Sequence, residues 1–158
     1  MPNEKPIIAP LLLTNTQARK VEADGAKAYP NECCGIMYGK DVMIDGAPRR
    51  QVTRLEEVEN SFENDEKYHR FSITPQTLMR AEKESAAHGE LVLGFYHSHP
   101  DHPARPSEYD RVHAWPFYSY VIVSIAKGEA VDMTSWMLDE ITETFSRQDI
   151  IETTEQTS

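Results

Sequence analysis

Apolar and polar residues follow one another in this chain in a way that predicts interleaved strands and helices. Residues 91–96 form an apolar run of strand length, as in a central strand covered on both faces. Residues 33–38 and 120–125 also read as buried strands, and residues 11–13 as a short one. Weaker strand patterns lie at residues 51–58, 70–74 and 130–138, and a turn is expected over residues 41–48.

Helix signals fall between these strands. Polar residues 14–16 offer N-caps for a helix running to about residue 28, and Pro30 ends it. A second helix has Thr74 as its cap, Pro75 at its first position and Gly89 just beyond its end. Ile73 and Leu78 are spaced for a hydrophobic staple across that cap.

The order of elements indicates the fold class. Strands that alternate with helices favour an α/β domain with a mixed central β-sheet flanked by helices. The 158 residues fit one domain of ordinary size. We expect the domain to span residues 7–148, with residues 149–158 as a polar C-terminal tail.

Composition and charge narrow the class of protein. The net charge of -10 disfavours nucleic acid as a partner, and the densest basic spot is only the pair Arg49 and Arg50. The cysteines, Cys33 and Cys34, are adjacent and form no disulfide framework, so a reducing compartment is expected. No signal peptide and no apolar run of membrane-spanning length is found, which predicts a cytoplasmic protein.

Two histidines follow the apolar run at residues 91–96. His97 and His99 are two residues apart, and side chains at this spacing on a strand point to the same face. Asp110 lies at the fourth position of a short helix that begins at Ser107 and stops near Pro116. A zinc site that performs chemistry usually takes three protein ligands, and these three residues predict such a site.

Each part of this pattern has a structural interpretation of its own. Ser107 and Asp110 fit a capping box, in which the serine caps the helix and the acid reaches back. A pair of histidines alone is common on protein surfaces. The combination of both, directly after an apolar strand, favours the metal site.

The same segments resemble a known family. The run Gly-Phe-Tyr-His-Ser-His-Pro at residues 94–100, followed by Pro-Ser-x-x-Asp at residues 106–110, is similar to the motif of JAMM (MPN-domain) zinc metallopeptidases. The run Tyr-Pro-Asn-Glu-Cys-Cys-Gly at residues 29–35 is similar to the family's upstream segment, which places Glu32 at its glutamate. The resemblance covers roughly residues 14–138. It implies an MPN/JAB fold with cytidine-deaminase-like architecture.

The resemblance also implies roles for single residues. His97, His99 and Asp110 would bind Zn²⁺, Glu32 would be the general base, and Ser107 would donate to the oxyanion. From its position alone, Glu32 would be a solvated turn carboxylate. Neighbouring residues on a strand point to opposite faces, so Cys33 and Cys34 are interpreted as small buried residues and not as zinc ligands.

The expected activity is zinc-dependent hydrolysis of a peptide or isopeptide bond. Family members act after the C-terminal glycine of a ubiquitin-like protein, and the short chain favours the stand-alone bacterial type that processes sulfur-carrier tails. The alternatives are a deubiquitinase-like isopeptidase and a non-catalytic MPN scaffold. His102 is interpreted as a solvated loop residue or a substrate contact, and His113 as a structural or supporting residue. The sequence leaves the oligomeric state open.

Overall fold

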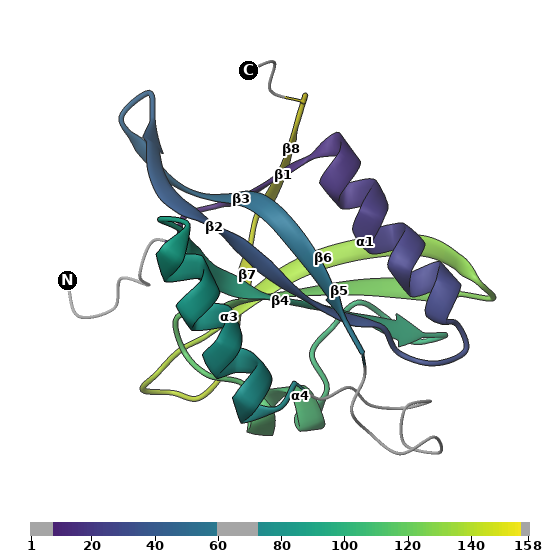
Figure 1. The fold of residues 1–158 in the computed structure, drawn as a ribbon. Coiled ribbons are helices and arrows are strands. Elements are labelled where there is room, and N and C mark those ends of the chain that lie inside the picture. The colour runs from purple at the N-terminus through teal and green to yellow at the C-terminus, as the bar shows by residue number, and fades with distance from the viewer. Residues whose placement is uncertain (1–7, 60–72, 156–158) are drawn as a thin grey trace.

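The computed structural model describes residues 8–59 and 73–155, which form a mixed sheet with helices on both faces (Figure 1). Within them the strand order is β7-β6-β5-β4-β2-β3-β1-β8. The pairs β4/β5, β1/β3 and β1/β8 are parallel, and the remaining pairs are antiparallel. The strands are β1 (Leu11–Thr14), β2 (Cys34–Ile44), β3 (Ala47–Val58), β4 (Leu91–Pro100), β5 (Ser119–Ala126), β6 (Glu129–Leu138), β7 (Phe145–Gln148) and β8 (Ile150–Thr153). The helices are α1 (Asn15–Ala28), α3 (Pro75–Ala87) and α4 (Glu108–His113). The predicted α/β class with a mixed central sheet is confirmed.

Helix α1 packs on one face of the sheet at very short range. Thr14 caps it, with its hydroxyl accepting the Gln17 N–H while the Gln17 side chain accepts the Thr14 N–H. A Cβ added to Gly25 would lie 2.8 Å from Cδ1 of Ile125, so only glycine lets the helix approach β5 this closely. Gly25, a poor helix former, is therefore explained by packing.

Helix α3 covers the other face, and its sequence signals are confirmed (Figure 1). The Thr74 hydroxyl accepts from the Thr77 N–H, and Pro75 occupies the first turn. Ile73 and Leu78 both pack against the apolar cluster beneath the helix. Gly89 has a φ of +67°, the left-handed conformation that ends many helices.

The hairpin between β2 and β3 is longer than expected. A turn was predicted over residues 41–48, but the strands continue to Ile44 and resume at Ala47. Only Asp45 and Gly46 form the turn, and both have positive φ, as in a two-residue hairpin. The extra pairs lie where side chains are mostly exposed, so no apolar pattern marked them as strand.

The expected C-terminal tail is wrong over Ile150–Thr153, which forms strand β8. This strand pairs parallel with β1, Leu11 with Ile150 through Thr14 with Thr153. Ile150 packs against the core, and the rest of the strand lies at the sheet edge, where polar residues are tolerated. We propose that the domain expected over residues 7–148 continues through Thr153.

Two further expectations concern a weak strand and membrane-spanning segments. Of the weak strand predicted at residues 70–74, the first three residues lie outside the described part of the chain. Ile73 and Thr74 precede α3 and form no strand. In residues 8–59 and 73–155, no helix has the length and apolar character needed to cross a membrane.

Candidate metal centre

The predicted histidine pair lies together on strand β4. His97 and His99 are buried, and their Nε2 atoms are 3.2 Å apart. Tyr96 and Ser98 alternate with them and point to the α1 face, where the Tyr96 hydroxyl donates to Asp24 at 2.7 Å. The strand alternation expected from the sequence therefore brings the two imidazoles to one side of the sheet.

Asp110 completes a three-residue cluster with the histidines. Its Oδ2 lies 3.2 Å from His99 Nε2, and its Oδ1 lies 3.4 Å from His97 Nε2. Asp110 is carried by the short helix α4, and Ser107 caps that helix. The Ser107 hydroxyl accepts the Asp110 N–H at 3.1 Å, and Asp110 Oδ2 accepts the Ser107 N–H at 2.8 Å. The Asp110 carboxylate thus takes part in the capping box and also faces both histidines.

The spacing of these atoms fits a zinc ion. A tetrahedral zinc with bonds of about 2.0–2.1 Å separates its ligand atoms by about 3.3–3.4 Å. Here the two Nε2 atoms are 3.2 Å apart, Asp110 Oδ2 lies 3.2 Å from His99 Nε2, and the other oxygen, Oδ1, lies 3.4 Å from His97 Nε2. Two imidazole nitrogens and a carboxylate oxygen are also ligand types that zinc prefers. The residues present therefore fit the metal that the sequence predicts.

Glu32 lies beside the histidine pair. It is buried just before β2, whose first residue, Cys34, pairs with His97 of β4. One ligand atom from each of Glu32, His97 and His99 lies within 4.8 Å of the others. That distance suits either a direct metal ligand or a carboxylate one water molecule away. Glu32 is thus not a solvated turn residue.

Electrostatics favour the ligand forms of His97 and Asp110. Burial lowers the pKa of His97, which keeps its imidazole neutral with a lone pair available. Burial alone would raise the pKa of Asp110, but the facing rings of His97 and His99 and the Ser107 N–H hold that pKa well below its usual range. Asp110 is therefore a carboxylate at any neutral pH.

His102 and His113 make other contacts. The side chain of His102 is exposed, and its backbone oxygen accepts from the Ser124 hydroxyl at 2.6 Å. His113 stacks on Tyr109 with ring centroids 4.0 Å apart, and its Nδ1 lies 2.9 Å from the Tyr109 oxygen. Among the described residues, one group of possible metal ligands consists of Glu32, His97 and His99, and neither His102 nor His113 is in it. Asp110 is also outside that group and joins the cluster through its contacts of 3.2 and 3.4 Å with the two histidines.

The cysteines are buried and free. Burial raises the pKa of Cys33 and of Cys34 to about 12, so both remain thiols. The prediction that they are buried residues is confirmed.

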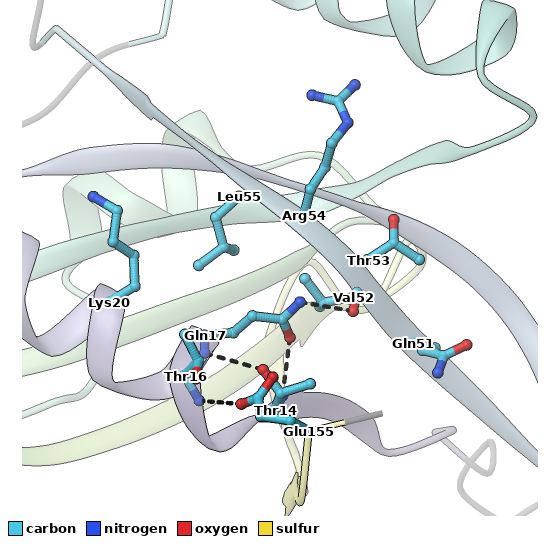
Figure 2. Close-up of a pocket in the computed structure, with 10 residues that line it drawn as sticks. All are labelled: Thr14, Thr16, Gln17, Lys20, Gln51, Val52, Thr53, Arg54, Leu55 and Glu155. Carbon is cyan, nitrogen blue, oxygen red and sulfur yellow. Dashed lines mark hydrogen bonds between the residues drawn. The ribbon is translucent and has the colours of Figure 1, made fainter. Parts of the chain in front are cut away.

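A separate groove of about 610 Å³ lies between the start of α1 and strand β3 (Figure 2). In Figure 2 the Gln17 side chain reaches across it and donates to the Val52 oxygen at 3.1 Å, while Glu155 accepts from the Thr16 N–H at 2.7 Å. No histidine or cysteine lines this groove. The chemistry predicted from the sequence therefore belongs to the histidine cluster.

The sheet and this cluster define a domain of the JAMM/MPN class. Residues 15–139 match the family model described as prokaryotic homologs of the JAB domain. The chain belongs to this family. The resemblance found in the sequence is confirmed.

Solved structures from prokaryotes are similar to the whole fold. A solution structure from Desulfitobacterium hafniense has 30% identity and a TM-score of 0.74, covering 92% of this chain and 94% of that one. A solution structure from Salinibacter ruber has 34% identity and a TM-score of 0.65, covering 91% of each chain. A JAB1/MPN domain protein from Archaeoglobus fulgidus has 15% identity and a TM-score of 0.52, covering 93% of this chain and 100% of that one, and shows the fold alone.

One similar protein has a named activity. The desampylase of Haloferax volcanii is 32% identical over 96 residues, which are 60% of this chain. The match spans 63% of that protein, less than two thirds of its length.

Proposed function

We propose that this protein is a zinc metallopeptidase that cleaves the bond after the C-terminal glycine of a ubiquitin-like protein. The observation that carries this proposal is the cluster of His97, His99 and Asp110, whose facing atoms are 3.2–3.4 Å apart. In the proposal these three residues hold one zinc ion. When bound there, the ion would supply Lewis acidity for hydrolysis.

Glu32 acts as the general base in this proposal. Its carboxyl group is buried beside the histidines and within 4.8 Å of their nitrogens, close enough to reach a water molecule between them. It takes a proton from the attacking water and passes it to the leaving amine. His97, His99 and Asp110 would hold the ion, and a catalytic zinc usually takes three protein ligands, so Glu32 is assigned as base and not as ligand.

Ser107 acts as the hydrogen-bond donor to the substrate. Its oxygen accepts the Asp110 N–H at 3.1 Å, which leaves the hydroxyl hydrogen to point elsewhere. The side chain is exposed at the start of α4, next to the ligand Asp110. From there it can donate to the carbonyl oxygen of the scissile bond as negative charge develops.

The proposed substrate is a ubiquitin-like protein with a Gly-Gly tail. Similarity to a desampylase supports this class, and within it we propose the sulfur-carrier proteins. A deubiquitinase-like isopeptidase is the second candidate. A non-catalytic scaffold is disfavoured, because all five proposed site residues are present and four of them are buried together. Free buried thiols favour the cytoplasm, and the charge of -10 disfavours nucleic acid.

The test uses two substrates built on one ubiquitin-like protein. In the first, its Gly-Gly tail is joined to a reporter by a peptide bond, and in the second to a lysine side chain. We expect cleavage after the last glycine, loss of activity with a chelator and recovery with zinc. The variant His97→Ala/His99→Ala should lose both zinc and activity. The control His88→Ala changes an exposed histidine and should keep both. Zinc-loaded protein that cleaves neither substrate would contradict the proposal.

A further inference from the structure

Ser98 lies between the two histidines of β4 and faces away from them. It is fully buried, with 0% of its surface exposed. Its hydroxyl oxygen accepts the backbone N–H of Cys33 at 2.8 Å, and its own N–H donates to the Cys33 oxygen at 3.3 Å. Ser98 thus holds the residue that directly follows Glu32.

This contact stands where regular strand pairing stops. The pairing of β2 with β4 begins at the pair Gly39 and Leu91 and ends at the pair Cys34 and His97. One step further, an antiparallel pair would exchange two backbone hydrogen bonds. At Cys33 a side-chain hydroxyl replaces the backbone carbonyl of Ser98 as the acceptor. The segment that carries Glu32 is therefore tied to β4 through a side chain.

We infer that Ser98 is a positioning residue that sets Glu32 against the histidine pair. The inference rests on the proposed role of Glu32 as the base. Because Ser98 shares a strand segment with His97 and His99, its hydroxyl fixes the Glu32 backbone relative to both nitrogens. A general base that shifts by about 1 Å can lose about 100-fold in rate, so this bond governs turnover without touching substrate.

The variant Ser98→Ala removes the acceptor of the Cys33 N–H. We expect kcat to fall by about 10- to 100-fold with little change in KM and with zinc content retained. Ser98→Thr keeps the hydroxyl and a side chain suited to a strand, and should restore most of the activity. Ser135→Ala is the matched control, because Ser135 is also buried and donates a side-chain bond of 2.7 Å, to Gln148. It should keep kcat near that of the unchanged protein.

A double-variant cycle separates positioning from general loss of structure. In the Glu32→Gln background the base is already absent, so adding Ser98→Ala should lower kcat no further. An equal fall in both backgrounds would overturn the inference, because Ser98 would then act independently of Glu32.

A measurement without substrate keeps the inference apart from the proposed function. In nuclear magnetic resonance of the zinc-loaded protein, Ser98→Ala should speed exchange of the Cys33 amide proton and shift the Glu32 signals, while Ser135→Ala should not. If Ser98→Ala does not accumulate, Ser98→Cys serves, because sulfur is a weak acceptor. If the unchanged protein cleaved neither substrate, the proposed function would be wrong, but the position of Ser98 against Glu32 would still be decided by this measurement. A Cys33 amide that stays protected, with unshifted Glu32 signals, would overturn the inference.

Discussion

The carbonyl oxygen of Pro103 lies 2.9 Å from Nδ1 of His99. Because a carbonyl can only accept, this contact places a ring hydrogen on Nδ1, so in the neutral ring the lone pair is on Nε2, which faces His97 and Asp110. The loop that carries Pro103 is held on both sides. Ser124 donates to the His102 oxygen and Thr134 to the Ala104 oxygen, each at 2.6 Å.

Loosening this loop should weaken zinc binding at the proposed site. Thr134→Val keeps the shape of a buried side chain but removes the donor to the Ala104 oxygen. We expect zinc affinity to fall by roughly threefold to tenfold, because an outer contact of His99 is disturbed and no ligand is lost. Competition with a zinc-binding dye measures it. Thr142→Val, at an exposed position, should leave the affinity unchanged. Equal affinities for the two variants would show that the loop does not orient His99.

Glu32→Gln tests the assignment of the base. The amide keeps the shape but loses the basic oxygen, so turnover should drop by about two to four orders of magnitude. Zinc content should stay near one per chain, measured by metal analysis of protein purified without chelator. Loss of the metal in this variant would make Glu32 a ligand. Full activity with full zinc would place the base elsewhere.

Ser107→Ala should affect rate and stability together. Loss of the proposed donor lowers kcat by about 10²- to 10³-fold. Loss of the helix cap lowers the free energy of unfolding by about 0.5–2 kcal/mol, measured by urea unfolding. Thr14→Ala is the matched control, because Thr14 caps α1 in the same way, away from the histidines. If both variants lose similar stability and neither loses activity, Ser107 is a cap alone.

Acid should weaken zinc binding at the proposed site. Burial by itself lowers the pKa of His99, but the hydrogen bond and charge of Asp110 and the Pro103 carbonyl outweigh it, so the pKa lies above its ordinary value of 6.5. A proton on Nε2 occupies the lone pair that zinc needs, and protonation of His99 is favoured at every pH below that raised pKa. As the pH is lowered, zinc affinity should therefore begin to fall while the pH is still above 6.5. It should then decline by about tenfold for each further unit of acidification. An affinity that stays constant on acidification to about pH 5.5 would contradict this competition.

Arg50 should matter for stability and not for zinc. It is buried, and its guanidinium donates to the oxygens of Leu93 and Phe117 and to the Ser119 hydroxyl at 2.6–3.2 Å. Arg50→Met leaves these acceptors without their donor and should cost about 2–4 kcal/mol in urea unfolding, with zinc content unchanged. The neighbouring Arg49 donates to the oxygen of the preceding residue, Pro48. Arg49→Met should therefore lower the free energy of unfolding by no more than about 0.5 kcal/mol. Similar costs for the two would show that Arg50 is not needed across the sheet.

Local patterns predicted the residues whose geometry is local. His97 and His99 share a face because strand side chains alternate, and the Ser107 cap follows from a motif four residues long. Glu32 could be identified only by family resemblance, because it meets His97 through the pairing of β2 with β4. The burial of Arg50 was missed for a similar reason, since its acceptors lie 43 to 69 residues further along the chain. Strand β8 was missed because its parallel partner, β1, lies near the other end of the sequence.

Oδ2 of Asp110 accepts the Ser107 N–H in the first turn of α4, and the same oxygen atom faces His99. In thermodynamic terms, forming that turn and binding the metal are linked equilibria, and the coupling between them is reciprocal. Zinc should stabilise the turn by the same free energy with which the formed turn strengthens zinc binding. A molecule that binds the outer side of α4 and stabilises its first turn would therefore raise metal occupancy without contacting any of the proposed metal ligands.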